Sequence, residues 1–505
     1  MGKLLMSISM IGLSANWLIE GGFKEKWRKN IDLNYTPIIL SGIFFLEIVW
    51  LIFAKDIGLG LGSIRIKLPL LVLPIVLGTS EKLNNKEIKT LITTFLLGVL
   101  LSTVVAHLVD MGFVNKKTIT KSSRDISIFM SHIRYSIILS FSIFLIVHLL
   151  INKKVKMLFG IILILWILNL IYKMSSLTAF IALFAGSTVF LLHSAIYSKN
   201  KTRIVLSGIF FSILFFMIFS ITTIINDHYT PKENIYFNQL EEFTAKGEKY
   251  VHLNRNELEN GFYIWKNIAE KELGSYWTKR SEIKFEGRDK KNQNIKNTIY
   301  RYLTSKGLKK DSLGLSKLSD EEIIEIENGE TTAIKYNLIS KRVRELLFEI
   351  ENFKKTQNPN NHSLTQRITY WKIGFEIFKQ ASVFGHGSGN HKYAYRNYYS
   401  NNDTILDKEN QRNAHNQFLT YLINFGFVGF FIWILLITIP SIRIIAMKTP
   451  FYISCILLFY IAFLSDDMLE RQAGVTIFAT IFYLIIFTNS DKNIKRLFFL
   501  EKYSK

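Results

Sequence analysis

The sequence predicts an all-α polytopic membrane protein, and its hydropathy, its long apolar runs and the distribution of its basic residues lead to that class. Of the 505 residues, 49% are hydrophobic and 20% are charged, and the mean hydropathy is +0.20. Soluble chains carry about 25% charged residues, and their apolar residues fall in short periodic segments instead of long runs. The composition therefore argues against a soluble enzyme.

About eleven apolar runs approach the roughly 17–25 residues that a transmembrane helix needs. They cover residues 4–19, 36–54, 66–79, 89–109, 132–151, 155–172, 174–195, 203–225, 414–446, 450–464 and 472–489. The stretch over 68–78 is broken by Pro69 and Pro74, as in a half-helix or re-entrant turn that must be buried in protein. We expect eleven to twelve helices, about eight of them over 1–225 and about three over 414–489.

The long polar stretch over 226–413 separates these two groups of helices. Its length and pattern exclude a linker, because residues 321–327, 337–353 and 364–380 show helical spacing of apolar side chains. The only cysteine, Cys455, lies in an apolar run, so an exported domain must fold without an intramolecular disulfide. We expect a large, mostly helical extramembrane domain.

The excess of basic over acidic residues is concentrated in the apolar part of the chain. Residues 226–412 hold 31 basic and 26 acidic side chains, whereas the rest of the chain holds 31 and 14. A nucleic-acid-binding protein gathers such an excess on a soluble face, but short basic loops between apolar spans orient a membrane protein and attract anionic lipid. We therefore expect membrane lipids as partners and no nucleic acid.

The positive-inside rule places residues 226–413 outside the cytoplasm, because nearly every basic loop and the tail over 490–505 then fall inside. The loop over 110–131 breaks the pattern, so either the topology differs there or its cations serve an anionic ligand. These cations are Lys116, Lys117, Lys121 and Arg124. Met1 also falls outside, and we expect either a further helix upstream or a first segment that does not fully span.

Two motifs in the polar region are candidates for ligand contact. Residues 363–366 form a capping-box pattern that predicts a helix start, and Arg367 follows beside the apolar stripe of that helix. Its planar fork of donors matches a phosphate, with simple exposure or a structural salt bridge as the alternative. Gly387 and Gly389 lie in a glycine-rich loop that allows close backbone approach to a ligand. A helix-to-helix turn also explains them, and no βαβ unit makes the loop a dinucleotide fingerprint.

His415 lies where the chain re-enters the membrane, between Arg412 and Asn416. Its near-neutral pKa suits it to take a proton from a hydroxyl on the aqueous side, with an interfacial anchor as the alternative. Arg134 and Lys173 lie near the outer ends of spans, where an ionisable group costs roughly 2.5–3.5 kcal/mol and usually faces a cavity, unless it snorkels to the interface. No histidine shows metal-ligand spacing, so we expect no protein-bound catalytic metal.

Four motifs occur in a fixed order along the chain. They are Gln366-Arg367 with Trp371, then Phe384-Gly-x-Gly-x-Gly, then His415-Asn416-x-x-Leu419, then Gly426-x-x-Gly429. This set resembles the O-antigen ligase and polymerase family of bacterial envelope enzymes. A likeness to ligase-family proteins of Bacteroidetes comes from residues 68–78, Ser131-His-Ile-Arg134, Glu259-Asn-Gly and Arg301-Tyr-Leu-Thr-Ser.

The resemblance implies a membrane glycosyltransferase of the GT-C type with a large periplasmic domain. Such a ligase passes a glycan from undecaprenyl diphosphate to lipid A core at the periplasmic face of the bacterial inner membrane, without a metal or other cofactor. Arg367 then corresponds to the family's diphosphate-binding arginine and His415 to its essential histidine. Further contacts to the diphosphate or glycan are expected from Arg134, Lys173, Arg412, Gly387, Gly389 and Asn416. Because charge grows on the diphosphate leaving group, we expect in-line attack with inversion at the anomeric carbon.

Two other functions remain open from the sequence. A polysaccharide polymerase uses the same donor with a second lipid-linked glycan as acceptor, and sequence alone separates the two poorly because acceptor choice depends on cavity shape. A lipid-linked glycan flippase is the alternative from another class. Transporters often show two matching halves and charges near the midplane, whereas here the candidate ionisable residues gather at one face.

Overall fold

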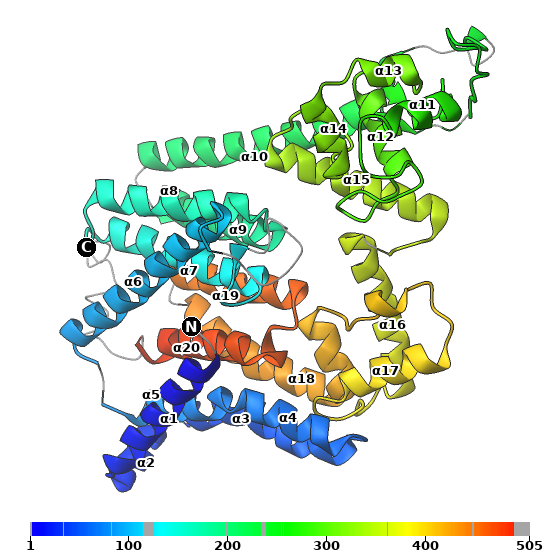
Figure 1. The fold of residues 1–505 in the computed structure, drawn as a ribbon. Coiled ribbons are helices and arrows are strands. Elements are labelled where there is room, and N and C mark those ends of the chain that lie inside the picture. The colour runs from blue at the N-terminus through cyan, green and yellow to red at the C-terminus, as the bar shows by residue number, and fades with distance from the viewer. Residues whose placement is uncertain are drawn as a thin grey trace. The chain divides into compact units, whose positions relative to one another are not determined.

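The computed structural model describes residues 3–33, 35–81, 83–114, 126–197, 200–233, 239–253, 255, 257–360, 362–446 and 449–488. The four basic side chains of the 110–131 loop and the predicted tail over 490–505 lie outside the described residues. Within the described ranges the chain is mostly helical, with one two-stranded sheet of β1 (Leu258–Glu259) and β2 (Phe262–Tyr263) (Figure 1). The predicted helical class is therefore confirmed.

The chain folds as two compact units. The first comprises Met1–Phe211 and Asn352–Lys505, and the second comprises Ser212–Glu351. The second unit covers much of the region over 226–413 that the sequence assigns to an extramembrane domain. Residues 352–413, however, pack with the first unit.

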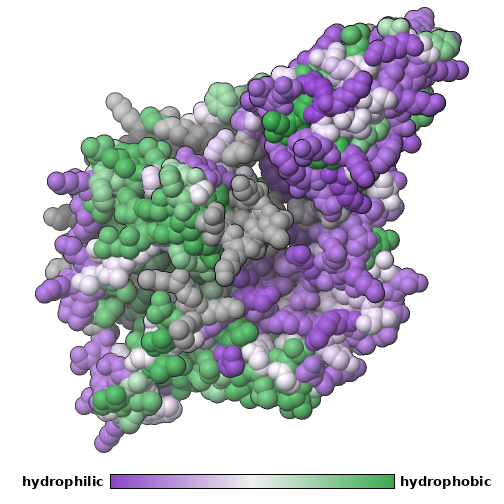
Figure 2. Space-filling view, viewed as in Figure 1, coloured by the Kyte–Doolittle hydropathy of each residue, from purple (hydrophilic) through white to green (hydrophobic). Residues whose placement is uncertain are grey.

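Apolar helices build the first unit. Among the residues that the structure describes, five helical stretches are long and apolar enough to cross a membrane by length and composition, namely Thr36–Phe53, Ile57–Thr79, Asn85–Asp110, His132–Ile151 and Gln417–Ile442. Five shorter apolar helices accompany them, namely Leu5–Ile19, Met157–Lys173, Leu177–His193, Pro450–Ser465 and Gln472–Phe487. Figure 2 shows hydrophobic side chains covering much of the face over α6 to α9. Several apolar helices of this kind are consistent with a multi-pass membrane protein.

The helices are numbered along the chain as in Figure 1. Those before the second unit are α1 (Lys3–Ile19), α2 (Phe23–Asp32), α3 (Thr36–Val49), the 3₁₀ turn η1 (Trp50–Phe53), α4 (Ile57–Lys67), α5 (Pro69–Thr79), α6 (Asn85–Asp110), α7 (His132–Ile151), α8 (Met157–Lys173) and α9 (Leu177–Tyr197). Those after it are α16 (Ser363–Gln380), α17 (His391–Asn401), the turn η4 (Lys408–Asn410), α18 (Gln417–Ala446), α19 (Pro450–Ser465), the turn η5 (Met468–Glu470) and α20 (Gln472–Thr488). Two helices, α10 (Asn200–Tyr229) and α15 (Leu338–Thr356), carry the chain from one unit to the other.

The proline-broken segment is part of a longer helical stretch. α4 continues into α5 through Leu68, whose backbone is helical (φ −47°, ψ −36°). Pro69 occupies the first position of α5, where the fixed φ of proline is compatible with a helix. At the other end, Asp56 caps α4 by accepting a hydrogen bond from the Leu59 N–H at 3.0 Å. The span therefore begins at Ile57, earlier than the apolar run predicted, because glycines and two basic residues interrupt the hydropathy of α4.

Close helix packing forms the core of the first unit. The ring of Phe144 on α7 lies against Gly186 of α9, where an added Cβ would come within 2.1 Å of the ring. Ser454 of α19 donates a hydrogen bond from Oγ to the Gly186 carbonyl at 3.1 Å. A small residue at a helix interface allows such close approach, so α9 contacts both α7 and α19.

The second unit has its own apolar core. Its short helices are α11 (Glu270–Trp277), α12 (Ile295–Ser305), α13 (Ser312–Ser316) and α14 (Asp320–Glu327). Trp277, Leu303 and Ile326 are fully buried between them. Ser319 begins α14 with a capping box, in which its hydroxyl and the Glu322 side chain satisfy free N–H groups at the helix start. The helices predicted over 321–327, 337–353 and 364–380 are observed as α14, α15 and α16.

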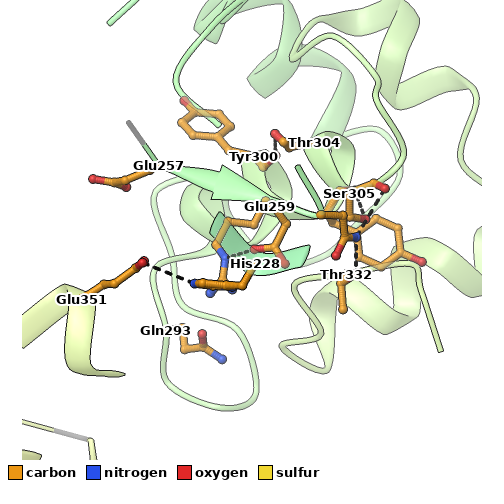
Figure 3. Close-up of polar contacts among 12 residues, drawn as sticks. His228, Glu257, Glu259, Gln293, Tyr300, Thr304, Ser305, Thr332 and Glu351 are labelled. Atoms are coloured by element: carbon orange, nitrogen blue, oxygen red, sulfur yellow. Dashed lines mark hydrogen bonds and ion pairs between the residues drawn. The ribbon is translucent and has the colours of Figure 1, made fainter. Parts of the chain in front are cut away.

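The β1–β2 hairpin brings together the two segments that the sequence singled out in this region. Its turn residues Asn260 and Gly261 have positive φ angles of 55° and 87°. Arg301 of α12 donates a hydrogen bond from Nε to Glu259 Oε2 at 2.7 Å, and the Asn260 side-chain amide donates to Thr332 Oγ1 at 3.0 Å (Figure 3). These contacts anchor the hairpin to α12 and to the segment before α15.

Candidate functional site

The first unit contains a polar cavity of about 700 Å³. The first turns of α7, α16 and α20, the end of α4, and the segment before α18 line it. Its volume falls in the range of roughly 300–1,000 Å³ that is usual for small-molecule sites. Segments far apart in sequence therefore meet around one cavity.

Arginines dominate the charge of this cavity. Its basic lining residues other than histidine are Arg65, Arg134, Arg367, Arg412 and Arg471. Asp466 is the one acidic side chain among the described lining residues. Each guanidinium stays charged and presents a planar fork of donors that matches the oxygens of a phosphate. The cavity is thus suited to an anion with several oxygens.

The helix α16 carries Arg367, and it is also hydrogen-bonded to the segment before α18, which forms another part of the cavity wall. Arg367 lies in the second turn of α16, and Trp371 one turn later donates a hydrogen bond from Nε1 to the Ala414 carbonyl at 2.9 Å. Tyr370 donates from its hydroxyl to the Asn410 carbonyl at 2.6 Å. The segment before α18 is therefore fixed against the same helix that carries Arg367. The predicted capping box at the start of α16 is wrong, because His362 is the N-cap residue and makes no side-chain cap bond.

His415 lies two residues before the start of α18, and its backbone has a strained conformation. Its φ is 49°, in the left-handed region that non-glycine residues rarely adopt. The next residue, Asn416, donates its N–H to Asp467 Oδ1 at 3.0 Å and caps α18 by accepting the Leu419 N–H at 3.2 Å. These bonds hold the turn that presents the His415 ring to the cavity. The Asn416 side chain itself acts as a helix cap, and it does not line the cavity.

The surroundings of His415 keep its imidazole neutral. Burial lowers the pKa of His415 below the usual 6.5, and the charges of Arg367, Arg412 and Arg471 lower it further. Asp466 acts in the other direction, with its Oδ1 at 4.0 Å from Nδ1 of the ring. A neutral imidazole near pH 7 is able to accept a proton.

Asp466 links the histidine to an arginine of the cavity. Its Oδ2 accepts a hydrogen bond from Arg134 at 2.8 Å, and both side chains are largely buried. Nε of Arg134 is buried and has no hydrogen-bond partner among the described residues. Asp466 therefore lies close to both Arg134 and His415. The Nε–H of Arg134 is not used in the bond to Asp466.

A buried ionic cluster supports the segment over 466–471. Lys67 of α4 is fully buried and lies 2.8 Å from Glu470 Oε1, and it also bonds Glu47 of α3. In the same segment the Leu469 N–H donates to Oε1 of Gln417 at 2.7 Å. Because buried charges are stable only when they are paired, this cluster fixes the segment that presents Asp466 and Arg471.

Comparison with known families bears on this site. A family model described as O-antigen ligase matches residues 323–434. The chain carries an O-antigen ligase family domain. This domain match confirms the family that the ordered motifs predict, and it includes Arg367, Arg412 and His415. It supports a function of the O-antigen ligase or polymerase type in general, with lipid-linked glycan and lipid acceptor substrates. No curated protein matches the chain.

The glycine-rich loop of the O-antigen ligase domain packs against another segment of the protein. Gly387 has φ 91°, and an added Cβ would lie 2.4 Å from the backbone nitrogen of Ala54. Gly389 has φ 69°, and its Cβ would lie 2.7 Å from the Leu59 carbonyl oxygen. Trp50 donates from Nε1 to the Phe384 carbonyl at 2.8 Å. The glycines thus allow close packing on η1 and α4. They do not line the polar cavity of about 700 Å³ described above, which we call the arginine cavity.

Lys173 is placed apart from the other predicted cations. Its ammonium group pairs with Asp110 at 2.5 Å at the ends of α8 and α6, about a third exposed, and it does not line the cavity. Among the residues that the structure describes, no group of three or more His, Cys, Asp or Glu side chains is arranged to hold a metal ion.

The sequence analysis did not identify three of the charged residues that line the cavity, Arg65, Asp466 and Arg471. Arg65 directly precedes the apolar run over 66–79. Asp466 and Arg471 lie in the short polar segment between the apolar runs over 450–464 and 472–489. The signal that identifies them is position, since each lies within about two residues of the end of an apolar segment. Their convergence depends on packing among α4, α7 and α20, which hydropathy does not report.

A second, apolar pocket of about 270 Å³ lies along the same helices. Side chains of α6, α7, α19 and α20 line it. On α7 it begins at Ile138, one turn beyond Arg134, and on α20 it begins at Thr476, one turn beyond Gln472. Two helices therefore line the arginine cavity at their first turns and the apolar pocket further along.

Proposed function

We propose that this chain is an O-antigen ligase, which transfers a glycan from undecaprenyl diphosphate to lipid A core at the periplasmic face of the bacterial inner membrane. The observation that carries the proposal is the cavity that five arginines line together with His415. A diphosphate ester is the leaving group of such a transfer, and its charge grows as the bond to the sugar breaks. Positive groups placed around that charge lower the barrier.

Four of the five arginines fall into two groups, one defined by an ion pair with Asp466 and the other by proximity to His415. Arg134 is paired with Asp466, so part of its charge is already balanced. Arg367, Arg412 and Arg471 are close enough to His415 to lower its pKa. We assign the diphosphate to this second group, with Arg367 as the main contact because it projects from the rigid helix α16. The anomeric carbon then lies near the imidazole.

His415 takes the proton in this scheme. The acceptor hydroxyl transfers its proton to the imidazole, its oxygen forms the bond to the anomeric carbon, and the bond from that carbon to the diphosphate oxygen breaks. Undecaprenyl diphosphate leaves from the face opposite to the attack, so the configuration inverts. Asp466 stabilises the imidazolium that forms, since its carboxylate lies 4.0 Å from Nδ1.

The apolar pocket along α7 and α20 suits the other half of an amphiphilic donor. A lipid diphosphate needs cationic groups for its head and an apolar surface for its chain. Arg134 and Ile138 lie one turn apart on the same face of α7, and Gln472 and Thr476 have the same relation on α20. We therefore assign the isoprenoid chain to this pocket and the diphosphate to the arginine cavity.

Transfer by purified protein in nanodiscs tests the proposal. The donor is an undecaprenyl-diphosphate glycan, supplied with lipid A core or without a separate acceptor. We expect glycan on lipid A core, and we expect Arg367→Ala and His415→Ala to abolish it while Arg396→Ala, an exposed arginine of α17, does not. Longer lipid-linked glycan without core would instead identify a polymerase. Absence of transfer in both arms, together with movement of donor across the bilayer, would identify a flippase.

A further inference from the structure

The second unit contains a polar pocket of about 390 Å³ that is separate from the arginine cavity. Three elements form it: the turn over 243–249, the helix α11, and the start of α13. We propose that this pocket binds an uncharged or amino-substituted sugar residue of a glycan. The inference does not depend on the chemistry of His415, because it concerns binding in another unit of the chain.

Two carboxylates form the polar part of the pocket and are held in fixed orientations. Glu272 accepts hydrogen bonds from the hydroxyls of Thr244 and Ser312, the latter at 2.9 Å. Asp311 accepts hydrogen bonds from the Tyr250 hydroxyl and, at 2.6 Å, from the Gly314 N–H. An ionised carboxylate has about four acceptor sites. Each group therefore retains acceptor capacity for the hydroxyls of a sugar, and hydrogen bonds to a charged acceptor are the stronger ones.

Apolar and aromatic side chains form the rest of the wall. Phe243 is 54% exposed and Leu313 is 56% exposed, and Tyr276 of α11 is half-buried between such residues in the lining. Large exposed apolar groups beside a polar pocket indicate a binding surface. A pyranose ring matches this combination, because it has C–H faces that pack on aromatic rings and hydroxyls around its edge.

The charge of the pocket favours a neutral or amino sugar over an anionic ligand. Its charged lining residues are Glu241, Glu272, Asp311, Lys246 and Lys309. Lys309 is paired with Glu241 at 2.6 Å, which leaves two carboxylates against one lysine. A phosphate or uronic acid would meet this excess of negative charge at short range. The pocket therefore favours neutral or amino sugars, in contrast to the arginine cavity.

The pocket is also preformed. The Thr244 N–H donates to the Glu248 carbonyl at 2.8 Å, which closes the turn that carries Phe243. The carboxylate of Glu248 accepts the N–H groups of Lys271 and Glu272 at 3.0 and 2.7 Å, which ties this turn to the start of α11. A site whose walls are held by such bonds loses little conformational freedom when a ligand binds.

The polar atoms of the wall argue for a glycan over an extended peptide. Peptides that bind in extended form use a row of backbone N–H and C=O groups on the receptor. Here the polar groups described above are side-chain carboxylates and hydroxyls, and the nearby backbone groups of Thr244 and Gly314 are bonded within the unit. Side-chain acceptors that come from two different elements, α11 and the start of α13, suit the hydroxyls of a sugar ring.

Ligand-observed saturation-transfer NMR on the full chain in nanodiscs tests this inference. The probes are galactose, N-acetylglucosamine, galactosamine, glucuronate, glucose 6-phosphate and a mixture of tripeptides. We expect saturation transfer to at least one neutral or amino sugar, and we expect it to weaken in Glu272→Gln. Any transfer to glucuronate or the phosphate, which the arginine cavity is suited to bind, should not change in that variant. Transfer only to the anionic sugars, only to the peptides, or to none of the probes would overturn the proposal.

Two variants locate the binding. Glu272→Gln keeps the size of the side chain but replaces one of its two acceptor oxygens with an NH₂ donor and removes the charge. We expect it to raise the Kd for the sugar about tenfold, since a hydrogen bond to a charged group contributes about 1.5–3 kcal/mol. Phe243→Ala, at an exposed position that the fold does not need, is expected to weaken binding by a similar factor. Glu286→Gln, at a carboxylate outside the pocket, serves as the matched control. Unchanged affinity in both pocket variants would contradict the assignment.

Discussion

The arginine cavity of the first unit and the pocket of the second unit show two ways in which one chain builds a polar site. In the first, five arginines and a single aspartate line the cavity, so its charge is predominantly positive. In the second, carboxylates predominate and local hydroxyls and N–H groups hold them. The difference teaches that charge balance, more than polarity, determines which ligand each site accepts.

The same contrast extends to how each site is supported. The segment over 466–471 depends on charges buried among apolar helices, with Lys67 and Glu470 as partners. The pocket of the second unit depends on buried and half-buried hydrogen bonds that hold its carboxylates within a small domain. Breaking one charge should therefore damage the first unit much more than the second.

The largest expected effect is that of Lys67→Met. The change leaves Glu47 and Glu470 buried without their cation, and removing one partner of a buried pair costs about 3–5 kcal/mol. Thermal unfolding of the protein in detergent should show a strong loss of stability. Lys173→Met is the control, because its pair with Asp110 is about a third exposed and contributes about 1 kcal/mol or less. Equal effects of the two variants would show that the buried cluster has no special role.

Lys310 makes the stability of the second unit dependent on pH above 7. Burial lowers the pKa of Lys310 to about 7, from the usual 10.5. Between these values the unfolded chain holds a proton that the folded chain lacks, so stability rises with pH by about 1.4 kcal/mol per unit. Below pH 7 both states are protonated and this contribution is constant. Protease resistance of the second unit in the intact protein, followed by mass spectrometry, should rise from pH 7 to 10.

Lys310→Met should flatten that pH profile, because the titrating group is removed from a site that is 1% exposed. The neighbouring Lys309 is about two-fifths exposed and pairs with Glu241. Lys309→Met should therefore leave the slope as it is in the unchanged protein. A profile that keeps its slope in Lys310→Met would contradict the assignment to Lys310.

A smaller effect is expected at the glycine-rich loop. Gly387→Ala adds a Cβ that would lie 2.4 Å from the Ala54 nitrogen at a φ of 91°, and such strain costs about 1–3 kcal/mol. Gly98→Ala on α6 meets nothing within 4 Å and should leave stability unchanged or slightly higher. Unfolding midpoints of the two variants measure the difference. If Gly387→Ala retained full stability but lost donor binding, the loop would be part of the ligand site.

How far the sequence predicted this molecule depends on the kind of residue. Arg367, Arg412 and His415 were identified because each stands beside a helix start or a membrane edge, and with Arg134 they line one cavity. Gly387 and Gly389 were read as ligand contacts, and the structure places them against η1 and α4. A glycine pattern records only that something lies close to the backbone, and it does not say whether that is a ligand or the protein itself.

The residues that sequence reasoning missed depend on long-range packing. Asp466 is 332 positions from Arg134, and no local pattern connects the two. Arg65 lies in α4, whose glycines and basic residues hid a helical stretch from a hydropathy reading. The sequence predicts Lys173 as a phosphate contact. Its actual partner, Asp110, comes from another helix, so no local pattern shows that the two side chains pair. Tertiary pairing, in each case, decides whether a charge is available to a ligand.

The smallest effect expected is a shift in a pH profile. Asp466 raises the pKa of His415, whereas burial and the nearby arginines lower it. Asp466→Asn should therefore move the acid limb of the transfer rate to lower pH, and Arg471→Gln should move it to higher pH. The rate measured at saturating donor between pH 4.5 and 8 tests both shifts. A limb that stays in place in both variants would show that another group controls it.

The most direct test of the account measures donor binding and single-turnover transfer on the same preparation of His415→Ala. We predict that this variant binds the undecaprenyl-diphosphate glycan as the unchanged protein does, because the arginines remain, and that transfer to lipid A core falls by about 10²–10⁴. Arg367→Ala, in contrast, should weaken donor binding. Transfer by His415→Ala at the rate of the unchanged protein would contradict the central claim that the arginine cavity holds the donor while His415 takes the proton.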